Sequence, residues 1–509
     1  MNNSLYDSKL VAKNTLYLYF RTLFVMGVSI FTSRIILDTL GIADYGIYNV
    51  VGGFVAMFSM LSGTLTAATQ RFIAYELGKD NPQIKKIFST TLNIHIILAI
   101  IIFILLESIG IWFLNHKMNI SPERIVAANW VFQCSVLTFS INLISIPYNA
   151  AIIAYEKMSA FAYISIIEVL SKLLTVYLLY IIAFDSLITY AIFMLIISIN
   201  LRIIYSWYCH KTFKECRYSF ILDKQTYREM IGFCGWNFIG STASVMNGQG
   251  INILINLFFG VTLNAARGIA TQIDSAINTF VTNFMMALNP QITKSYAAGN
   301  FEYVNKMIIL GSKYSFFLFW IICLPIYLNT DYLLQVWLKQ IPQHASLFIR
   351  FTIIYSLCQS LSQCLYTAML ASGKIKKYQI IVGTISIMSF PLAFLFFKLG
   401  LPGEYGYISM IICSLLCFIA RLWLLQNMIQ GFSAIIFLKK VLLPIILTIL
   451  PTICIISIIH YIINTINFIT FITETGICCC ICFIFIFYIG LTSSERNYIT
   501  KIVKEKIIK

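Results

Sequence analysis

The stretch STTLNIHIILAIIIFILLESIGIWF, residues 89–113, carries a single charged side chain, that of Glu107. About 20 apolar residues in a helix are enough to cross the hydrocarbon core of a bilayer, and this stretch is longer. It is also too long for a strand of a membrane barrel, whereas a helix satisfies its backbone hydrogen bonds internally. The stretch therefore predicts a transmembrane helix.

The composition of the whole chain extends this prediction. Of its 509 residues, 59% are hydrophobic and 11% are charged, and the mean hydropathy is +0.84. A soluble domain carries about 25% charged residues, so this chain has too few charges to cover a water-facing surface. We expect an all-α, polytopic membrane protein with about 14 transmembrane helices. The expected spans are about 14–36, 47–69, 89–113, 125–148, 160–182, 186–208, 231–258, 265–289, 309–328, 346–370, 379–397, 404–426, 441–461 and 466–490.

The basic residues set the orientation of the chain. The N-terminal run contains Arg21 and Arg34 and no small-residue cleavage site, so we interpret it as the first span and not as a signal peptide. With the N-terminus inside, most of the 36 lysines and arginines fall in inner loops and the C-terminal tail. The outer loops hold Lys117, Arg124, Arg267, Lys339 and Lys398. The positive-inside rule therefore predicts cytoplasmic termini. The same spread accounts for the net charge of +16 without nucleic acid, which would require one clustered basic face.

The two halves of the chain contain similar sequence segments. TLGIADYGIYNVV (39–51) is matched by FFGVTLNAARGIA (258–270), YELGKDN (75–81) by YAAGNFE (296–302), and IIAYEKMSAFAYISII (152–167) by MLASGKIKKYQIIVGT (369–384). The number of residues between matched segments is nearly constant. Each repeat holds six spans, an even number, so both repeats begin on the same side of the membrane and are parallel. Rocking of one repeat against the other would expose an axial cavity to alternate sides of the membrane. We expect an N-terminal lobe (1–208), a cytoplasmic linker (209–230), a C-terminal lobe (231–430), and two further helices with a basic tail (431–509).

Several motifs occur in order along residues 10–430. They are Arg34 followed by Leu40-Gly41 and DYGIY (44–48), TQRFIAYELGKDN (69–81), IPYNAAIIAYEKM (146–158), ARGIA (266–270) and NPQITKSYAAGN (289–300). In these motifs the chain resembles the Wzx polysaccharide (O-antigen) flippases. Wzx proteins belong to the multidrug/oligosaccharidyl-lipid/polysaccharide exporter superfamily, which includes multidrug exporters and the lipid II flippase. The resemblance implies a MATE-like, V-shaped bundle of two six-helix lobes in the bacterial inner membrane.

The resemblance also implies a cargo and partners. The cargo is an oligosaccharide on undecaprenyl pyrophosphate, moved for lipopolysaccharide O-antigen or capsule synthesis, and the partners are membrane lipids, a polysaccharide polymerase and other pathway proteins. Cation-coupled multidrug exporters often carry an acidic residue in the first span. This chain departs from them, because its first span has Arg21 and no carboxylate before Asp38.

A pyrophosphate crossing the membrane needs cationic partners, because an unpaired charge in hydrocarbon is very costly. Arg21, Arg34 and Arg267 are the expected partners. Arg21 faces either a cavity or, by snorkelling, the inner headgroups. Arg34 has Asp38 four residues on, so a structural ion pair is the alternative for it.

Polar residues recur at steps of three and four along three expected spans of the second half, which places each set on one helix face. They line a wet interior or, alternatively, bond neighbouring helices. The sets are Arg267, Thr271, Asp274, Asn278 and Thr282; Asn237, Ser241, Ser244, Gly248 and Asn252; and Ser356, Gln359, Gln363 and Thr367. The predicted substrate-binding residues are Arg21, Arg34, Arg267, Thr271, Asp274, Asn278, Asn252, Gln359 and Gln363.

Ion coupling, to H⁺ or Na⁺, is expected at intramembrane charges. Glu107 and Asp274 are lone carboxylates, and burial favours their protonated form. Glu168 and Lys172 lie four residues apart, so they are either a coupling pair or a self-neutralising structural pair.

No enzyme signature is present: there is no Walker loop, no HExxH and no GxSxG, and the histidines and cysteines show no metal-ligand spacing. We expect no catalysis, no metal and no cofactor. Two competing functions remain. A cation-coupled multidrug exporter is disfavoured by the intramembrane arginines. A membrane polysaccharide polymerase is disfavoured because the longest outer loop, about 329–345, is short.

Overall fold

The computed structural model describes residues 3–56, 58–116, 120–182, 184–221, 223–337, 342, 344–463, 467–497 and 500. Every regular element in these ranges is a helix, so the expected all-α fold is confirmed. Ten of the helices are long and apolar enough to cross a membrane, and they coincide with the expected spans three to six and nine to fourteen. The other four expected spans lie in the helices α1 (Asn3–Ala56), α2 (Ser59–Leu77) and α8 (Lys224–Ala297). Some side chains of these helices are outside the described residues. The chain is a multi-pass membrane protein.

The chain forms two compact units. The first comprises residues 1–241 and 286–299, and the second comprises residues 242–285 and 300–509. The helices of the first unit are α1 (Asn3–Ala56), α2 (Ser59–Leu77), α3 (Ile84–Leu105), η1 (Leu106–Gly110), α4 (Ile111–His116), η2 (Pro122–Arg124), α5 (Ile125–Ala154), α6 (Met158–Leu179), α7 (Ser186–Thr212) and η3 (Lys214–Cys216), with both ends of α8 (Lys224–Ala297).

The second unit takes the middle of α8 and the rest of the chain. Its helices are α9 (Phe301–Leu328), α10 (Thr330–Trp337), α11 (Ala345–Ser372), α12 (Ile375–Ile387), α13 (Ser389–Lys398), α14 (Tyr405–Met428), α15 (Ala434–Phe437), η4 (Leu438–Leu442), α16 (Leu443–Ile463), α17 (Phe468–Phe485) and η5 (Ile486–Gly490).

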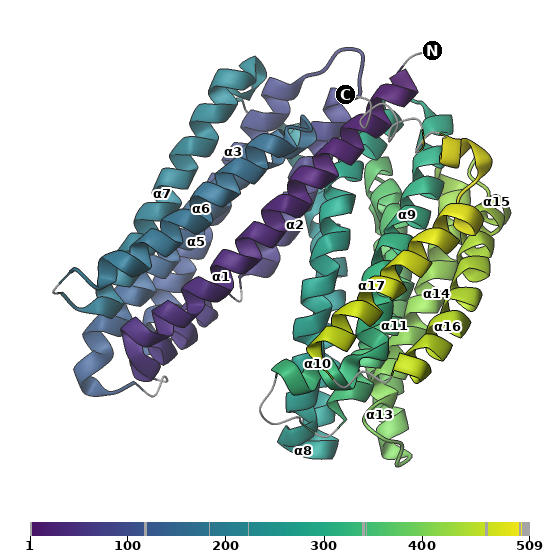
Figure 1. Cartoon of the computed structure of the whole chain (residues 1–509). Coiled ribbons are helices and arrows are strands. Elements are labelled where there is room, and N and C mark those ends of the chain that lie inside the picture. The colour runs from purple at the N-terminus through teal and green to yellow at the C-terminus, as the bar shows by residue number, and fades with distance from the viewer. Residues whose placement is uncertain are drawn as a thin grey trace. The chain divides into compact units, whose positions relative to one another are not determined.

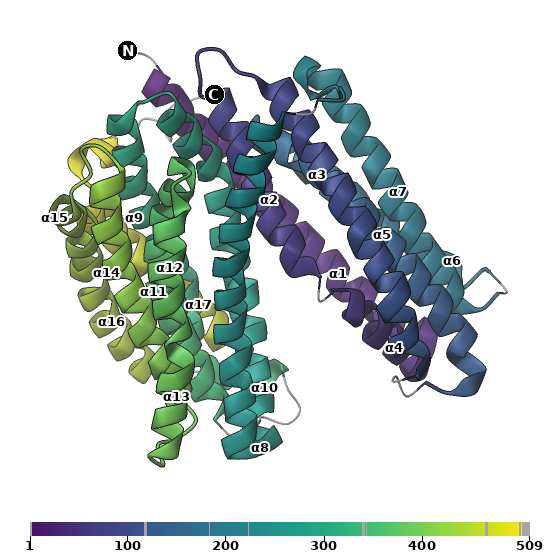
Figure 2. The same cartoon turned by 180° about the vertical axis from the view of Figure 1, so that it is seen from behind.

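Each unit packs around one central helix. In the first unit α5 contacts α2, α3 and α7, and α1 lies along α6 (Figure 1). Val131, Val136 and Leu143 of α5 are fully buried in its apolar core. In the second unit α11 contacts α9 and α14, with α12 beside α14 (Figure 2).

Two of the longest helical segments change direction. Gly41 divides α1 with φ 73° and ψ 169°, a backbone conformation that glycine adopts without a Cβ clash. This break falls in the expected loop between spans one and two.

In α8, Arg267 donates to the carbonyl of Gly248 at 2.9 Å. A straight helix would place residues 19 positions apart about 28 Å from each other, so the chain reverses between them.

The loops meet in the pattern that the expected topology requires. In the first unit, Lys86 pairs with Asp223 and Lys294 with Glu156, each at 2.7 Å, and all four lie in loops or helix ends expected inside. In the second unit, the expected outer residues His344 and Glu404 meet at 2.5 Å. Loops assigned to one side of the membrane therefore contact each other, while the orientation itself stays a prediction.

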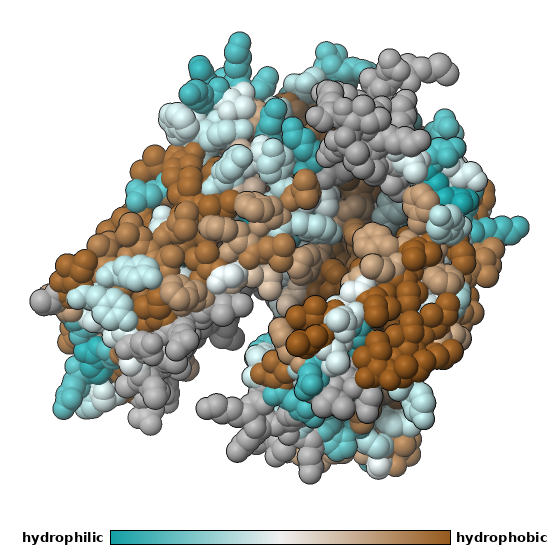
Figure 3. Space-filling view, in the orientation of Figure 1, coloured by the Kyte–Doolittle hydropathy of each residue, from teal (hydrophilic) through white to brown (hydrophobic). Residues whose placement is uncertain are grey.

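The outer surface carries the apolar side chains that a bilayer requires. Ile469 of α17 is 75% exposed and Phe483 is 61% exposed, as is Leu450 of α16 at 59%. Figure 3 shows the brown, hydrophobic surface over α16 and α17. Water would penalise so large an apolar face, and acyl chains would not.

Candidate functional site

Arg267 is buried, with 4% of its surface exposed. Besides the bond from its Nη2 to Gly248, its guanidinium carbon lies 5.2 Å from the ring centre of Tyr407 on α14. Its Nη1 is buried and has no hydrogen-bond partner among the described residues. A buried guanidinium with an unused donor is costly unless an anion or water satisfies it.

Asp274 lies two turns along the same stripe of α8. The side-chain amide of Asn278 donates to its carboxylate at 2.7 Å, and the hydroxyl of Ser356 on α11 donates to the same oxygen. Both donors are neutral, and no ion pair to Asp274 occurs among the described residues. The structure thus brings Asp274 and Asn278 of α8 together with α11.

The other predicted residues of the second unit take separate positions. Thr271 is exposed and its hydroxyl donates within its own helix, to the carbonyl of Gly268 at 2.8 Å. Gln359 donates to the hydroxyl of Tyr355 at 2.8 Å. Asn252 and Gln363 are half-buried, and no described hydrogen bond joins either to the Asp274 group.

In the first unit Arg21 is half-buried on α1. Its guanidinium carbon lies 4.5 Å from the ring centre of Phe161 on α6, which is a cation–π contact, and its Nε is buried without a hydrogen-bond partner. The Lys172 ammonium lies 2.6 Å from the Glu168 carboxylate further along α6. The structural pairing considered for these two residues is therefore formed. Arg34 lies outside the residues whose side chains are described.

Glu107 occupies the π-helical turn η1. The amide of Gln133 on α5 donates to the Oε2 of Glu107 at 3.0 Å, and Oε1 is buried without a partner in the described ranges. Single π-helical turns are frequent at functional sites. Glu107 therefore stays a candidate for ion coupling.

Two arginines with the same character were not among the predicted site residues. The guanidinium carbon of Arg202 of α7 lies 4.0 Å from the ring centre of Tyr148. Among the residues that the structure describes, no hydrogen-bond partner is found for the buried Nη1 of Arg202 or for the buried Nε and Nη1 of Arg421 on α14. The signal for both was available, because each is a lone arginine within an apolar run, as Arg21 is.

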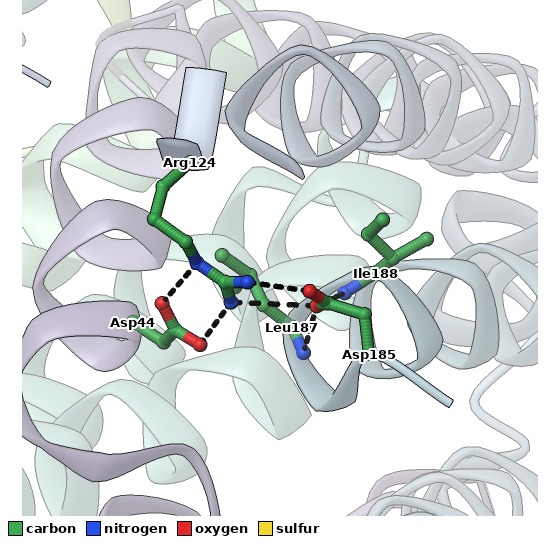
Figure 4. Close-up of polar contacts among 5 residues, drawn as sticks. All are labelled: Asp44, Arg124, Asp185, Leu187 and Ile188. Carbon is green, nitrogen blue, oxygen red and sulfur yellow. Dashed lines mark hydrogen bonds and ion pairs between the residues drawn. The ribbon is translucent and has the colours of Figure 1, made fainter. Parts of the chain in front are cut away.

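One charged cluster pairs a single arginine with two carboxylates. Arg124 of η2 donates from Nε to Asp44 at 2.9 Å and from Nη1 to Asp185 at 2.5 Å, with further bonds to each carboxylate (Figure 4). Asp185 also caps α7 by accepting from the backbone of Leu187 and Ile188. Burial raises the pKa of Asp185, but the bonds from Arg124 and from the two backbone N–H groups outweigh it and leave that pKa below its usual value. This cluster joins three loops that are expected outside.

Two families match the chain. "Polysaccharide biosynthesis protein" matches residues 11–296, and "MatE" matches residues 244–395. No curated relative matches the chain. Arg21 and Glu107 lie within the first match, and Arg267 and Asp274 lie within both. Arg421 lies outside both matches.

Solved structures are similar over most of the chain. A MATE protein in complex with MaL6 has a TM-score of 0.69 at 12% identity, covering 84% of this chain and 99% of that one. A Vibrio cholerae MATE transporter has a TM-score of 0.69 at 17% identity, with 83% and 98% covered. A Pyrococcus furiosus transporter, described as having a binding pocket of reverse polarity that suggests a different function, has a TM-score of 0.67 at 13% identity, with 81% and 95% covered. These likenesses show a MATE-like fold.

Proposed function

Because the chain belongs to the polysaccharide biosynthesis protein family, we propose that it flips undecaprenyl-pyrophosphate-linked oligosaccharide units across the inner membrane. The units would serve surface polysaccharide synthesis, as O-antigen or capsule, with a polymerase acting after the flippase. Both termini would be cytoplasmic, in keeping with the distribution of lysine and arginine. The two family matches indicate a transporter of the multidrug/oligosaccharidyl-lipid/polysaccharide exporter superfamily rather than an enzyme.

The observation that carries the proposal is the unused donor of Arg267. A diphosphate carries oxygens that accept charge-assisted hydrogen bonds, and arginine matches phosphate geometry with two parallel donors. Arg267 is 4% exposed, and within the described part of the chain its Nη1 has no hydrogen-bond partner. In the first unit, considered by itself, the half-buried Arg21 has an Nε without a hydrogen-bond partner among the described residues.

Cargo movement against a gradient needs a driving ion, and Asp274 is the proposed site for it. Its carboxylate is held by two neutral donors, so a proton or Na⁺ would be its first counter-charge. Glu107, with its free oxygen, is the second candidate.

A multidrug exporter is the alternative that one observation favours. The MatE match covers residues 244–395, which include Asp274. A cationic drug would need carboxylates that face it, whereas Arg267 would repel it. The flippase is therefore the better-supported proposal.

The test is expression in a bacterium that lacks its own flippase but keeps the matching sugar pathway. We expect surface polysaccharide to return and lipid-linked units to stop accumulating on the cytoplasmic side. Raised resistance to cationic dyes without polysaccharide export would favour the multidrug exporter. Units that reach the outer leaflet without help from the chain, but polymerise only in its presence, would favour the polymerase.

A further inference from the structure

The second unit holds a cavity of about 630 Å³ apart from the stripe on α8. Its walls come from α9, from the turn and helices at α15–η4, and from the segment after η5. The polar groups that line it include Glu302, Lys306, Lys313, Lys439, Lys440 and Glu495. All these elements lie at the end of the unit where the expected inner loops gather.

One of its acidic side chains is already neutralised. The ammonium of Lys313, 2% exposed, lies 2.8 and 2.7 Å from the two carboxylate oxygens of Glu495. The backbone N–H of Thr492 also donates to Glu495 at 2.7 Å. The ion pair between Lys313 and Glu495 holds the segment after η5 against α9. Because this pair has no net charge, the other ionisable side chains determine the charge of the cavity.

The remaining charge is positive. Lys306, Lys439 and Lys440 line the cavity together with one further carboxylate, that of Glu302. The ion pairs found in the described part of the chain include none of these three ammonium groups. Three cations around a concave site attract a ligand with concentrated negative charge, such as a phosphate.

The cavity is also bordered by apolar surface. Phe432, Ile309 and Pro444 contribute to its lining. Next to it, Ile435 is 63% exposed and Leu443 is 52% exposed, on the face that continues along α16. A ligand that satisfies both surfaces has an anionic head and hydrocarbon chains.

We propose that this cavity binds the headgroup of an anionic phospholipid of the adjacent leaflet, with its acyl chains along α15 and α16. Basic pockets between transmembrane helices on the cytoplasmic side are suited to such headgroups. The lysine stems reach along the apolar wall while the ammonium groups meet the phosphate. This lipid is distinct from the proposed cargo, and its site does not depend on the proposed function.

The experiment uses the purified full-length chain in micelles that contain equal amounts of dioleoyl-phosphatidylglycerol and dioleoyl-phosphatidylcholine. Native mass spectrometry measures the lipid retained on the protein. We expect the wild type to retain phosphatidylglycerol preferentially, and the variant Lys439→Gln/Lys440→Gln to bind it about tenfold more weakly. Lys306→Gln, on a different wall, should weaken it less.

The matched control is Lys374→Gln/Lys377→Gln, which removes two exposed lysines of another expected inner loop. It should retain phosphatidylglycerol as the wild type does. Equal retention by the pocket variants and the wild type would overturn the proposal, as would equal losses in pocket and control variants. Displacement of the lipid by inorganic phosphate at similar concentration would identify a free-phosphate site and reject the lipid assignment.

Discussion

Arg124 and Arg267 differ in what surrounds them. Arg124, in an expected outer loop of the first unit, is bonded on both edges by the carboxylates of Asp44 and Asp185. Arg267, on α8 in the second unit, contacts a backbone carbonyl and an aromatic face, and its Nη1 has no partner among the described residues. A fully paired cation holds loops together, whereas a buried cation without a counter-charge is suited to an anion that arrives from outside the protein.

The largest effect is expected at Arg267. Arg267→Ala should lower polysaccharide export by about thirtyfold or more, because removing one partner of a buried charged contact costs about 2–5 kcal/mol. Arg267→Lys should restore part of the loss, since it returns the charge without the paired donors. Export per molecule of membrane-inserted protein is the measurement, with the exposed Arg217→Ala as the control. If Arg267→Ala exports polysaccharide at the wild-type level, the proposed difference between Arg267 as a cargo-binding residue and Arg124 as a structural residue is wrong.

The next effect concerns Asp274, which has no ionic partner among the residues that the structure describes. Asp274→Asn keeps the shape but cannot take up a coupling proton, so export should no longer respond to an imposed proton or Na⁺ gradient. The check is lipid-linked sugar transport into reconstituted vesicles with and without each gradient. Glu168→Gln, at the paired carboxylate, is the control and should keep the response. A gradient response retained by Asp274→Asn would move the coupling site elsewhere.

Arg124→Ala should act on stability instead of transport. Its loss leaves two carboxylates facing each other and costs about 1–2 kcal/mol, an estimate already reduced for side chains that are 19–30% exposed. Thermal unfolding in detergent should occur at lower temperature, with export per folded molecule close to the wild type. A collapse of export with unchanged thermal stability would contradict the structural role.

The smallest effect is a pH dependence at the same cluster. The pKa of Asp185 is below its usual value in the folded protein, so its stabilisation is present above about pH 4 and is lost as the pH falls through the folded pKa. The wild type should therefore lose more thermal stability between pH 6 and pH 3 than Asp185→Asn does. Identical acid sensitivity of the two proteins would show that the cluster does not contribute.

The sequence predicted the helices better than their contacts. Apolar runs such as 89–113 reveal spans directly, since length and charge are local properties. The spacing of Arg267, Asp274 and Asn278 also predicted one helix face. That Ser356 donates to Asp274 was beyond the sequence, because the register between α8 and α11 depends on packing along their whole lengths.

The same limit applied to the charged loops. Arg124 was predicted only as an outer residue, and its pairing with Asp44 and Asp185 joins positions far apart in the chain. The π-helical turn at Glu107 has no simple sequence pattern. Arg202 and Arg421 were missed although the signal was the one used for Arg21. The boundaries of the two lobes, the linker and the C-terminal segment stay predictions, and so do the roles of the site residues.

The most direct measurement is binding of undecaprenyl pyrophosphate to the purified protein, compared between Arg267→Ala and Arg124→Ala. We predict that Arg267→Ala binds it at least about tenfold more weakly than the wild type, whereas Arg124→Ala, once folded, binds it equally well. Equal binding by Arg267→Ala and the wild type would contradict the assignment of this intramembrane arginine to the anionic cargo.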